Sequence, residues 1–182
     1  MAEYGEWATS PSELTKDTTL AFKAQLLKDA HEEWMRQAAG SIPARHQFTP
    51  RSVKGFVGNL MIFERHTDGY YIRLMGTRIA GVLGEMQGKS VTEAVPPEVA
   101  RNWARAFDAV LATPTPQRIV RTVNFDDSHY LEAEIFLAPL RDDHGALTMV
   151  FAVVAFRSGV TPSHKLGDII ASNNSDDGQQ DG

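Results

Sequence analysis

Residues 70–90, YYIRLMGTRIAGVLGEMQGKS, decide the fold because their hydrophobic period changes from strand-like to helix-like within a few positions. Over 70–75 the side chains alternate between two faces, as they do in a half-buried β-strand. The apolar residues of 79–83 then follow helical spacing, and Gly84 ends the helical pattern. A short strand that runs directly into a short helix can form one wall of a cavity, and the rest of the chain must supply the other walls.

The remaining elements follow from the same periodicities. We expect helices over 18–39 and 97–112, and strands over 59–64, 70–75, 118–125, 130–140 and 147–157. The last three strands are joined by short polar loops and form an antiparallel meander. The first two must join the same sheet, because an isolated hairpin is only marginally stable. The fold class is therefore α+β: a five-stranded antiparallel sheet with short helices on one face, plus an N-terminal amphipathic helix.

The domain boundaries follow from changes in composition. The chain has 182 residues, of which 42% are hydrophobic, and this fits one globular domain with polar extensions. We expect a flexible N-terminal lead over 1–17, the N-terminal helix over 18–40 and the main domain over 41–157. The segment 158–182 has too little apolar surface to offset the cost of ordering, so we expect a disordered tail there.

Charge and composition exclude several functions. A net charge of −5 argues against nucleic acid as a partner. The chain contains no cysteine, which excludes disulfides, thiolate metal sites and cysteine nucleophiles. The six histidines show no metal-ligand spacing, so no metal site is expected. The N-terminus lacks the pattern of a signal peptide and the longest apolar run is too short to span a membrane, so we expect a cytoplasmic protein with no membrane span.

Four segments carry a resemblance to a known family: Trp34, IPARHQFTP at 42–50, YIRLMGTRIAGVLG at 71–84 and MQGKSVTE at 86–93. They resemble the single-domain PAS family common in alphaproteobacteria, and the resemblance extends over roughly residues 32–156. It implies a five-stranded sheet that cups several helices, and a role in sensing or in protein contact during signalling.

Two departures from better-known PAS branches limit the cofactors. Flavin photoreceptors of this fold use a cysteine beside the flavin, and this chain has none, so blue-light adduct chemistry is excluded. Haem sensors carry an axial histidine on the long helix, whereas residues 97–112 contain no histidine, so haem is not expected. We expect no cofactor.

One face of the predicted sheet is a candidate pocket for a small apolar metabolite, and ordinary core packing is the alternative. The predicted lining residues are Ile72, Leu74, Ile79, Leu83, Trp103, Phe107, Ile119, Ile135 and Met149. Arg45, Arg51 and Arg73 are candidate polar anchors, although arginines in such connectors more often hold a loop by bonding its carbonyls. Alternation places Arg73 on the other face of the sheet, where we expect it to pair with Glu132 or Glu134.

The apolar side of the N-terminal helix needs a surface to cover. The helix can lie on the sheet of its own chain as an intramolecular lid, or on the sheet of a second copy. We expect the second arrangement, a homodimer. The predicted interface consists of Phe22, Leu26, Leu27, Trp34, Tyr71 and Phe136.

These patterns predict a non-enzymatic sensory or regulatory protein that acts by contact with a signalling partner and is modulated by a small ligand. One alternative is a small cone-shaped enzyme or hydrophobic-ligand binder that resembles ketosteroid isomerase. That reading requires Glu132 or Glu134 in the pocket with a raised pKa. A further alternative is a structural domain with a filled core.

Overall fold

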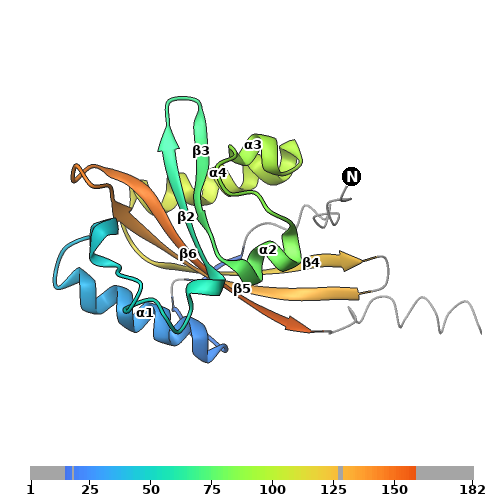
Figure 1. Cartoon of the computed structure of the whole chain (residues 1–182), viewed down its shortest axis with the longest axis horizontal. Helices are drawn as coiled ribbons and strands as arrows, with labels where there is room; N and C mark the ends of the chain where they lie inside the picture. The colour runs from blue at the N-terminus through green and yellow to red at the C-terminus, as the bar shows by residue number, and fades with distance from the viewer. Residues whose placement is uncertain (1–14, 18, 127–128, 159–182) are drawn as a thin grey trace, which may run out of the picture.

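The structure is a computed structural model that describes residues 15–17, 19–126 and 129–158. The described chain forms one six-stranded antiparallel sheet in the order β1-β4-β5-β6-β2-β3 (Figure 1). The strands are β1 (Thr15–Asp17), β2 (Leu60–His66), β3 (Gly69–Met75), β4 (Gln117–Asp126), β5 (His129–Arg141) and β6 (Leu147–Ser158). The helices are α1 (Gln25–Ala38), α2 (Thr77–Leu83), α3 (Val91–Ala94) and α4 (Pro97–Ala112), with short 3-10 turns at Arg45–Gln47 and Val57–Asn59.

The five strands expected from the sequence are present and antiparallel, so the predicted fold class is confirmed. Strand β1 is an addition, because Thr15–Asp17 pair with β4 although they fall in the expected flexible lead. Three residues are too few to show an alternating pattern, so the sequence gives no signal for this strand. The expected tail lies outside the described residues, apart from its first residue, which ends β6.

Helix α1 begins at Gln25, several residues later than predicted. Leu20 has a φ of 53°, and the Phe22 amide donates a hydrogen bond of 2.8 Å to the Leu20 carbonyl, so the chain turns here before the helix starts. The N-cap residue Ala24 has no side chain that can accept a hydrogen bond. Its amide donates instead to the carboxylate of Glu134 on β5, which lies 110 residues away in sequence.

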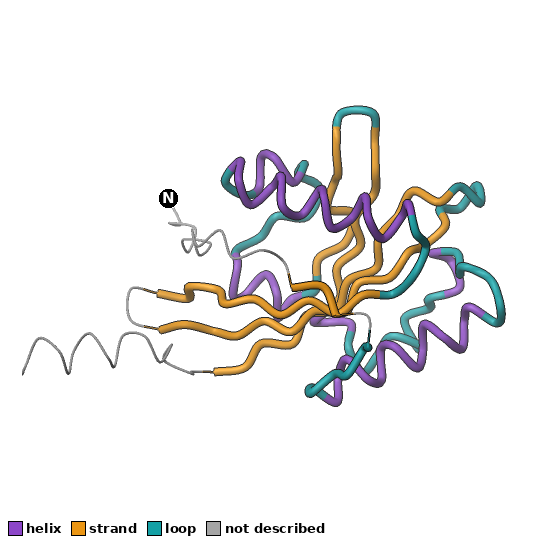
Figure 2. Tube along the Cα trace, turned by 180° about the vertical axis from the view of Figure 1, so that it is seen from behind, coloured by secondary structure: helices purple, strands orange, loops and turns teal. Residues whose placement is uncertain are grey.

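The sheet separates two hydrophobic cores. On one face α1 packs through Leu27 and Trp34 onto Phe136 and Phe151. The Trp34 Nε1 atom donates to the backbone carbonyl of Pro139 at 3.2 Å, which satisfies the buried indole. The opposite face carries the second core, beneath α2, α3 and α4. Figures 1 and 2 show α1 and α4 on opposite sides of the strands.

A β-bulge interrupts the alternation of β3. Ile62 pairs with Leu74, but Phe63 pairs with Ile72, so Arg73 is the extra residue. Leu74 consequently packs with the α1 core, whereas Met75 returns to the core beneath α4. The prediction that Leu74 faces the same side as Ile72 was wrong, because the bulge changes the face of every residue that follows it.

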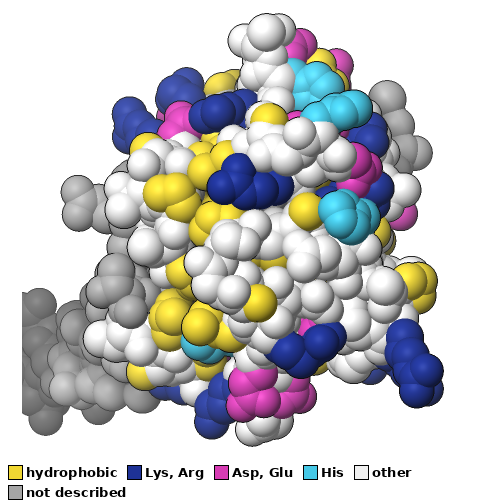
Figure 3. All heavy atoms as spheres, turned by 90° about the vertical axis from the view of Figure 1, so that its left-hand side faces the viewer, with side chains coloured by type: hydrophobic (Ala, Val, Ile, Leu, Met, Phe, Trp, Pro, Cys, Tyr) yellow, Lys and Arg dark blue, Asp and Glu magenta, His cyan; other side chains and the backbone are white. Residues whose placement is uncertain are grey.

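The surface carries charges of both signs. On the face shown in Figure 3, Lys and Arg side chains are distributed together with Asp and Glu side chains and are not gathered into one patch. Among the residues whose side chains the structure describes, the exposed large hydrophobic ones are Met35 and Val57. Within the described ranges, no helix is both long enough and apolar enough to cross a membrane.

Candidate ligand site

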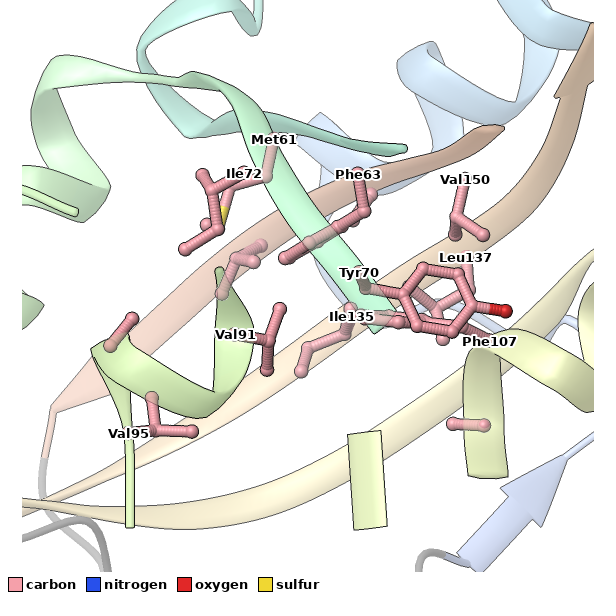
Figure 4. Packing of buried hydrophobic residues seen from close by; sticks show 14 of the residues in the cluster. Met61, Phe63, Tyr70, Ile72, Val91, Val95, Phe107, Ile135, Leu137 and Val150 are labelled. Carbon is pink, nitrogen blue, oxygen red and sulfur yellow. The ribbon is translucent and has the colours of Figure 1, made fainter. Parts of the chain in front are cut away.

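An apolar cavity lies between the sheet and the helices α2, α3 and α4. Its volume is about 60 Å³. Its walls are contributed by β2, β3, α2, α3, α4, β4, β5 and β6, together with the segment between α2 and α3. Figure 4 shows Ile72, Val91 and Ile135, which come from a strand, a helix and a second strand on this side of the sheet. The site is therefore built by residues far apart in the sequence.

The structure brings together some of the predicted lining residues. Those that border the cavity are Ile72, Leu83, Trp103 and Ile135. Those that lie in the same core without bordering the cavity are Ile79, Phe107 and Ile119, each fully buried. The aromatic rings continue from the lining into the core, because the Trp103 ring stacks on Phe107 with 5.6 Å between centroids.

Leu74 and Met149 lie on the opposite face, in the core beneath α1. Leu74 is displaced by the bulge in β3. Met149 belongs to the continuous apolar run of β6, where both faces of the strand are buried and the sequence shows no alternation to assign a side. The placement of these two residues in the pocket was wrong.

Arg121 is the charged side chain among the described residues that line the cavity, and it was not predicted. Its Cζ atom lies 5.6 Å from the centroid of the Trp103 ring, a separation at which a cation–π interaction is favourable. Burial lowers the pKa of the Arg121 guanidinium, which still remains protonated at neutral pH. The signal was present in the sequence, because Arg121 follows the inward-facing Ile119 by two positions on the same strand.

A small side chain lies beside Arg121 on the sheet. Its cross-strand neighbour on β5 is Ala133, and the neighbour of Ala133 on β6 is Phe156. All three line the cavity, so they form a row across the sheet with the smallest side chain in the middle. A larger residue at Ala133 would occupy the space beside the guanidinium.

The predicted polar anchors do not reach the cavity lining. Arg45 donates to Asp143 at 2.9 Å, between two well-exposed side chains. Arg51 is exposed. Arg73 pairs with Glu64 at 2.9 Å instead of with Glu132 or Glu134, because the bulge places it beside β2.

Glu134 is 1% exposed and lies on the α1 face of the sheet, away from the cavity. Its carboxylate accepts hydrogen bonds from the Lys23 amide at 2.9 Å, the Ala24 amide at 2.9 Å and the Arg118 Nε at 2.6 Å. Burial by itself would raise the pKa of Glu134, but these donors outweigh burial and hold the pKa below its ordinary value. We call this set of four residues the Glu134 latch.

Neither candidate base of the isomerase-like alternative meets its requirement. Glu134 lies in the latch with a lowered pKa. Glu132 does not line the cavity and lies 3.6 Å from the Arg157 Nη1 atom on β6. The alternative therefore has no carboxylate from β5 at the cavity.

The predicted interface residues lie mainly inside the molecule. Phe22, Leu27, Trp34 and Phe136 are buried in the core beneath α1, and Leu26 packs against that core. Tyr71 is half-buried, and its hydroxyl donates to Asp68 at 2.8 Å. The assignment of the four buried side chains to a partner interface was wrong, because α1 covers its own sheet as an intramolecular lid.

A family model described as a PAS domain matches residues 22–155. The chain belongs to this PAS family. The match includes α1, β4, β5, most of β6 and every cavity-lining residue except Phe156, so the PAS resemblance of the sequence is confirmed. Membership in this family implies a sensory or regulatory role.

Several solved structures have a similar arrangement, whereas no curated protein matches the chain. A light-oxygen-voltage domain studied with a flavin analogue is 17% identical, with a TM-score of 0.41, over 64% of this chain and 87% of that one. VqmA of Vibrio cholera, in a complex with ligand and DNA, is 11% identical, with a TM-score of 0.44, over 67% of this chain and 56% of that one. The LOV domain of the blue-light photoreceptor Aureochrome1 is 14% identical, with a TM-score of 0.41, over 69% of this chain and 98% of that one. The family assignment rests on the sequence match and not on these structures.

Proposed function

We propose that this PAS protein is a non-enzymatic regulator whose cavity takes a small apolar ligand and whose output is a change in the docking of α1. A signalling protein that contacts α1 or the surface beside it would then read the change. The observation that carries the proposal is the position of the Glu134 latch directly behind the cavity wall.

The two sites share one pair of strands. Ala133 lines the cavity, and the next residue along β5 is Glu134, which holds the start of α1. On β4, Arg121 lies opposite Ala133 and Val120 lies opposite Glu134. Consecutive residues of a strand point to opposite faces, so a displacement of β4 and β5 by a ligand moves the latch as well.

The chemistry of the cavity supports binding and gives no support to catalysis. Its described lining is apolar apart from Arg121, which is a poor general acid or base because it stays protonated. The volume of about 60 Å³ is small beside the ~300–1,000 Å³ of typical small-molecule sites. This favours a small ligand over a bulky cofactor such as flavin or haem. Cytoplasmic location, the homodimer and the signalling partner remain predictions, and native mass spectrometry of the purified protein would measure the oligomer mass.

Amide hydrogen exchange tests the proposal, with hexan-1-ol as a neutral six-carbon probe. We expect the probe to slow exchange in β4 and β5 and to change exchange at the first turn of α1. The control variant is Ala152→Val, which adds two methyl groups to the cavity wall and should weaken both responses. If the probe binds and α1 exchange stays the same, the proposed output is wrong. If neither hexan-1-ol nor its carboxylate analogue hexanoate produces a response in any strand, the proposed ligand input is wrong.

A further inference from the structure

We propose that the ligand is a small apolar molecule with a single carboxylate, and that Arg121 binds that carboxylate. This inference rests on the proposed function, because it names the class of ligand that the cavity takes. The residue that carries it is Arg121, whose guanidinium belongs to an otherwise apolar lining.

Arg121 differs from other arginines of the described chain in what it contacts. On the same strand, Arg118 pairs with Glu134 at 2.6 Å. On β3, Arg73 pairs with Glu64 at 2.9 Å. No carboxylate of the described residues forms an ion pair with Arg121, and its neighbour is an aromatic face. A partly buried charge without a counter-ion is costly, and an anionic ligand would remove that cost.

The surroundings of the guanidinium select a carboxylate. A guanidinium presents two parallel N–H groups that match the two oxygens of a carboxylate. The Trp103 ring lies against the guanidinium and restricts its orientation, and the cross-strand neighbour of Arg121 is the small residue Ala133. A phosphate carries more charge and more acceptor oxygens, and a single arginine would leave most of them without donors in an apolar site.

The rest of the cavity selects the body of the ligand. Beyond Arg121 and Trp103 the wall is formed by aliphatic, methionine and phenylalanine side chains, including Met61, Val99 and Val154. These groups favour an aliphatic or aromatic body. The small cavity volume of about 60 Å³ restricts that body to a short chain or a single ring. A short-chain or small aromatic carboxylate meets both requirements.

The test compares three probes that share a six-carbon chain and differ in charge: hexanoate, hexan-1-ol and hexylamine. Dissociation constants come from chemical-shift titrations at neutral pH. We expect hexanoate to bind at least about tenfold more tightly than hexan-1-ol, as is typical of a hydrogen-bonded charge, and hexylamine to bind more weakly than either.

Two substitutions with the same change in net charge test whether the preference for hexanoate depends on Arg121 itself. Arg121→Gln should remove the preference for hexanoate, whereas Arg105→Gln, at an exposed position of α4, should leave it unchanged. Arg121→Lys keeps the charge without the planar pair of donors and should retain only part of the preference. If Arg121→Gln does not fold, the comparison of probes on the native protein and on Arg121→Lys still decides the matter.

The outcomes distinguish this inference from the proposed function. Equal affinities for hexanoate and hexan-1-ol would overturn the inference and leave the ligand input standing. The inference also fails if Arg105→Gln weakens hexanoate as much as Arg121→Gln does. If none of the three probes binds, both the inference and the proposed ligand input fail.

Discussion

Replacing the buried carboxylate of Glu134 should be the most damaging polar substitution in the α1 half of the molecule. In Glu134→Gln an NH2 group replaces one carboxylate oxygen. This NH2 group would then face the N–H donors of Lys23, Ala24 or Arg118 and could not accept their hydrogen bonds. The side chain of Arg118 is only 12% exposed, so the ion pair with Glu134 would be lost in a largely buried place.

The magnitude follows from what is lost. A hydrogen bond to a charged group contributes roughly 1.5–3 kcal/mol, and removal of one partner from a buried ion pair costs roughly 3–5 kcal/mol. We therefore expect Glu134→Gln to lower the free energy of unfolding by about 3–5 kcal/mol in urea titrations. Hydrogen exchange should accelerate first at the start of α1, because two of the three donor groups belong to Lys23 and Ala24.

Glu132→Gln is the matched control on the same strand. Glu132 lies 3.6 Å from Arg157, and both side chains are partly exposed, so this substitution should cost no more than about 1 kcal/mol. The reasoning would be refuted if both variants unfolded with the same free energy, or if Glu134→Gln left exchange in α1 unchanged.

The latch also has a pH dependence with a definite sign. The folded pKa of Glu134 lies below the ordinary value of 4.5, chiefly because its donors outweigh the effect of burial. Its stabilising contribution is complete above that ordinary value and is lost as the pH falls through it toward the lowered folded pKa. Urea titrations across this range should show a steeper loss of stability in the native protein than in Glu134→Gln.

Three further predictions concern single positions. Gly76→Ala should destabilise the protein by about 1–3 kcal/mol in urea unfolding, because the new Cβ would overlap the backbone carbonyl of Gly58. Gly81→Ala is the control: a Cβ at this position would have no neighbouring atom within 4 Å, so the substitution should stabilise α2 by about 0.5–1 kcal/mol. Burial lowers the pKa of His31 below 6.5, so the free energy of unfolding should fall as the pH drops through 6.5. His31→Phe should reduce this pH dependence, and an unchanged pH dependence in the variant would show that His31 is not its source. Gln117→Leu should raise the melting temperature, because the buried Oε1 atom accepts no hydrogen bond from the described residues; a lower melting temperature would show that the amide is satisfied in solution.

The sequence predicted the elements well because their identity depends on local periodicity. The helix over 97–112 coincides with α4, and the strand over 70–75 lies within β3. The face that each residue occupies was harder to predict. The bulge at Arg73 requires knowledge of how β2 pairs with β3, and β6 is buried on both faces, so neither Leu74 nor Met149 carries a local signal of its orientation.

Some residues of the candidate site could also be predicted from the sequence, and others could not. The apolar lining was partly predictable, since Ile72 and Ile135 occupy regular positions of their strands. Arg121 was also within reach of the alternation rule, but a charged residue on an interior face contradicts the expectation that charges face water. The Glu134 latch was beyond sequence reasoning, because the helix start and its cap are 110 residues apart.

Because the sheet carries a hydrophobic core on each face, a movement of one strand changes the packing in both cores. Ile135 lies in the cavity-side core and Phe136 lies in the α1-side core, and the two are joined by one peptide bond. Ile135 and Phe136 are both buried, so a shift of β5 on one side must be accommodated on the other. The apolar contacts beneath α1 change little over small displacements, because dispersion and burial have no strong directional preference. The hydrogen bonds of Glu134 depend steeply on distance and angle, and we therefore expect them to be the first contacts of α1 to change if a ligand displaces the cavity wall.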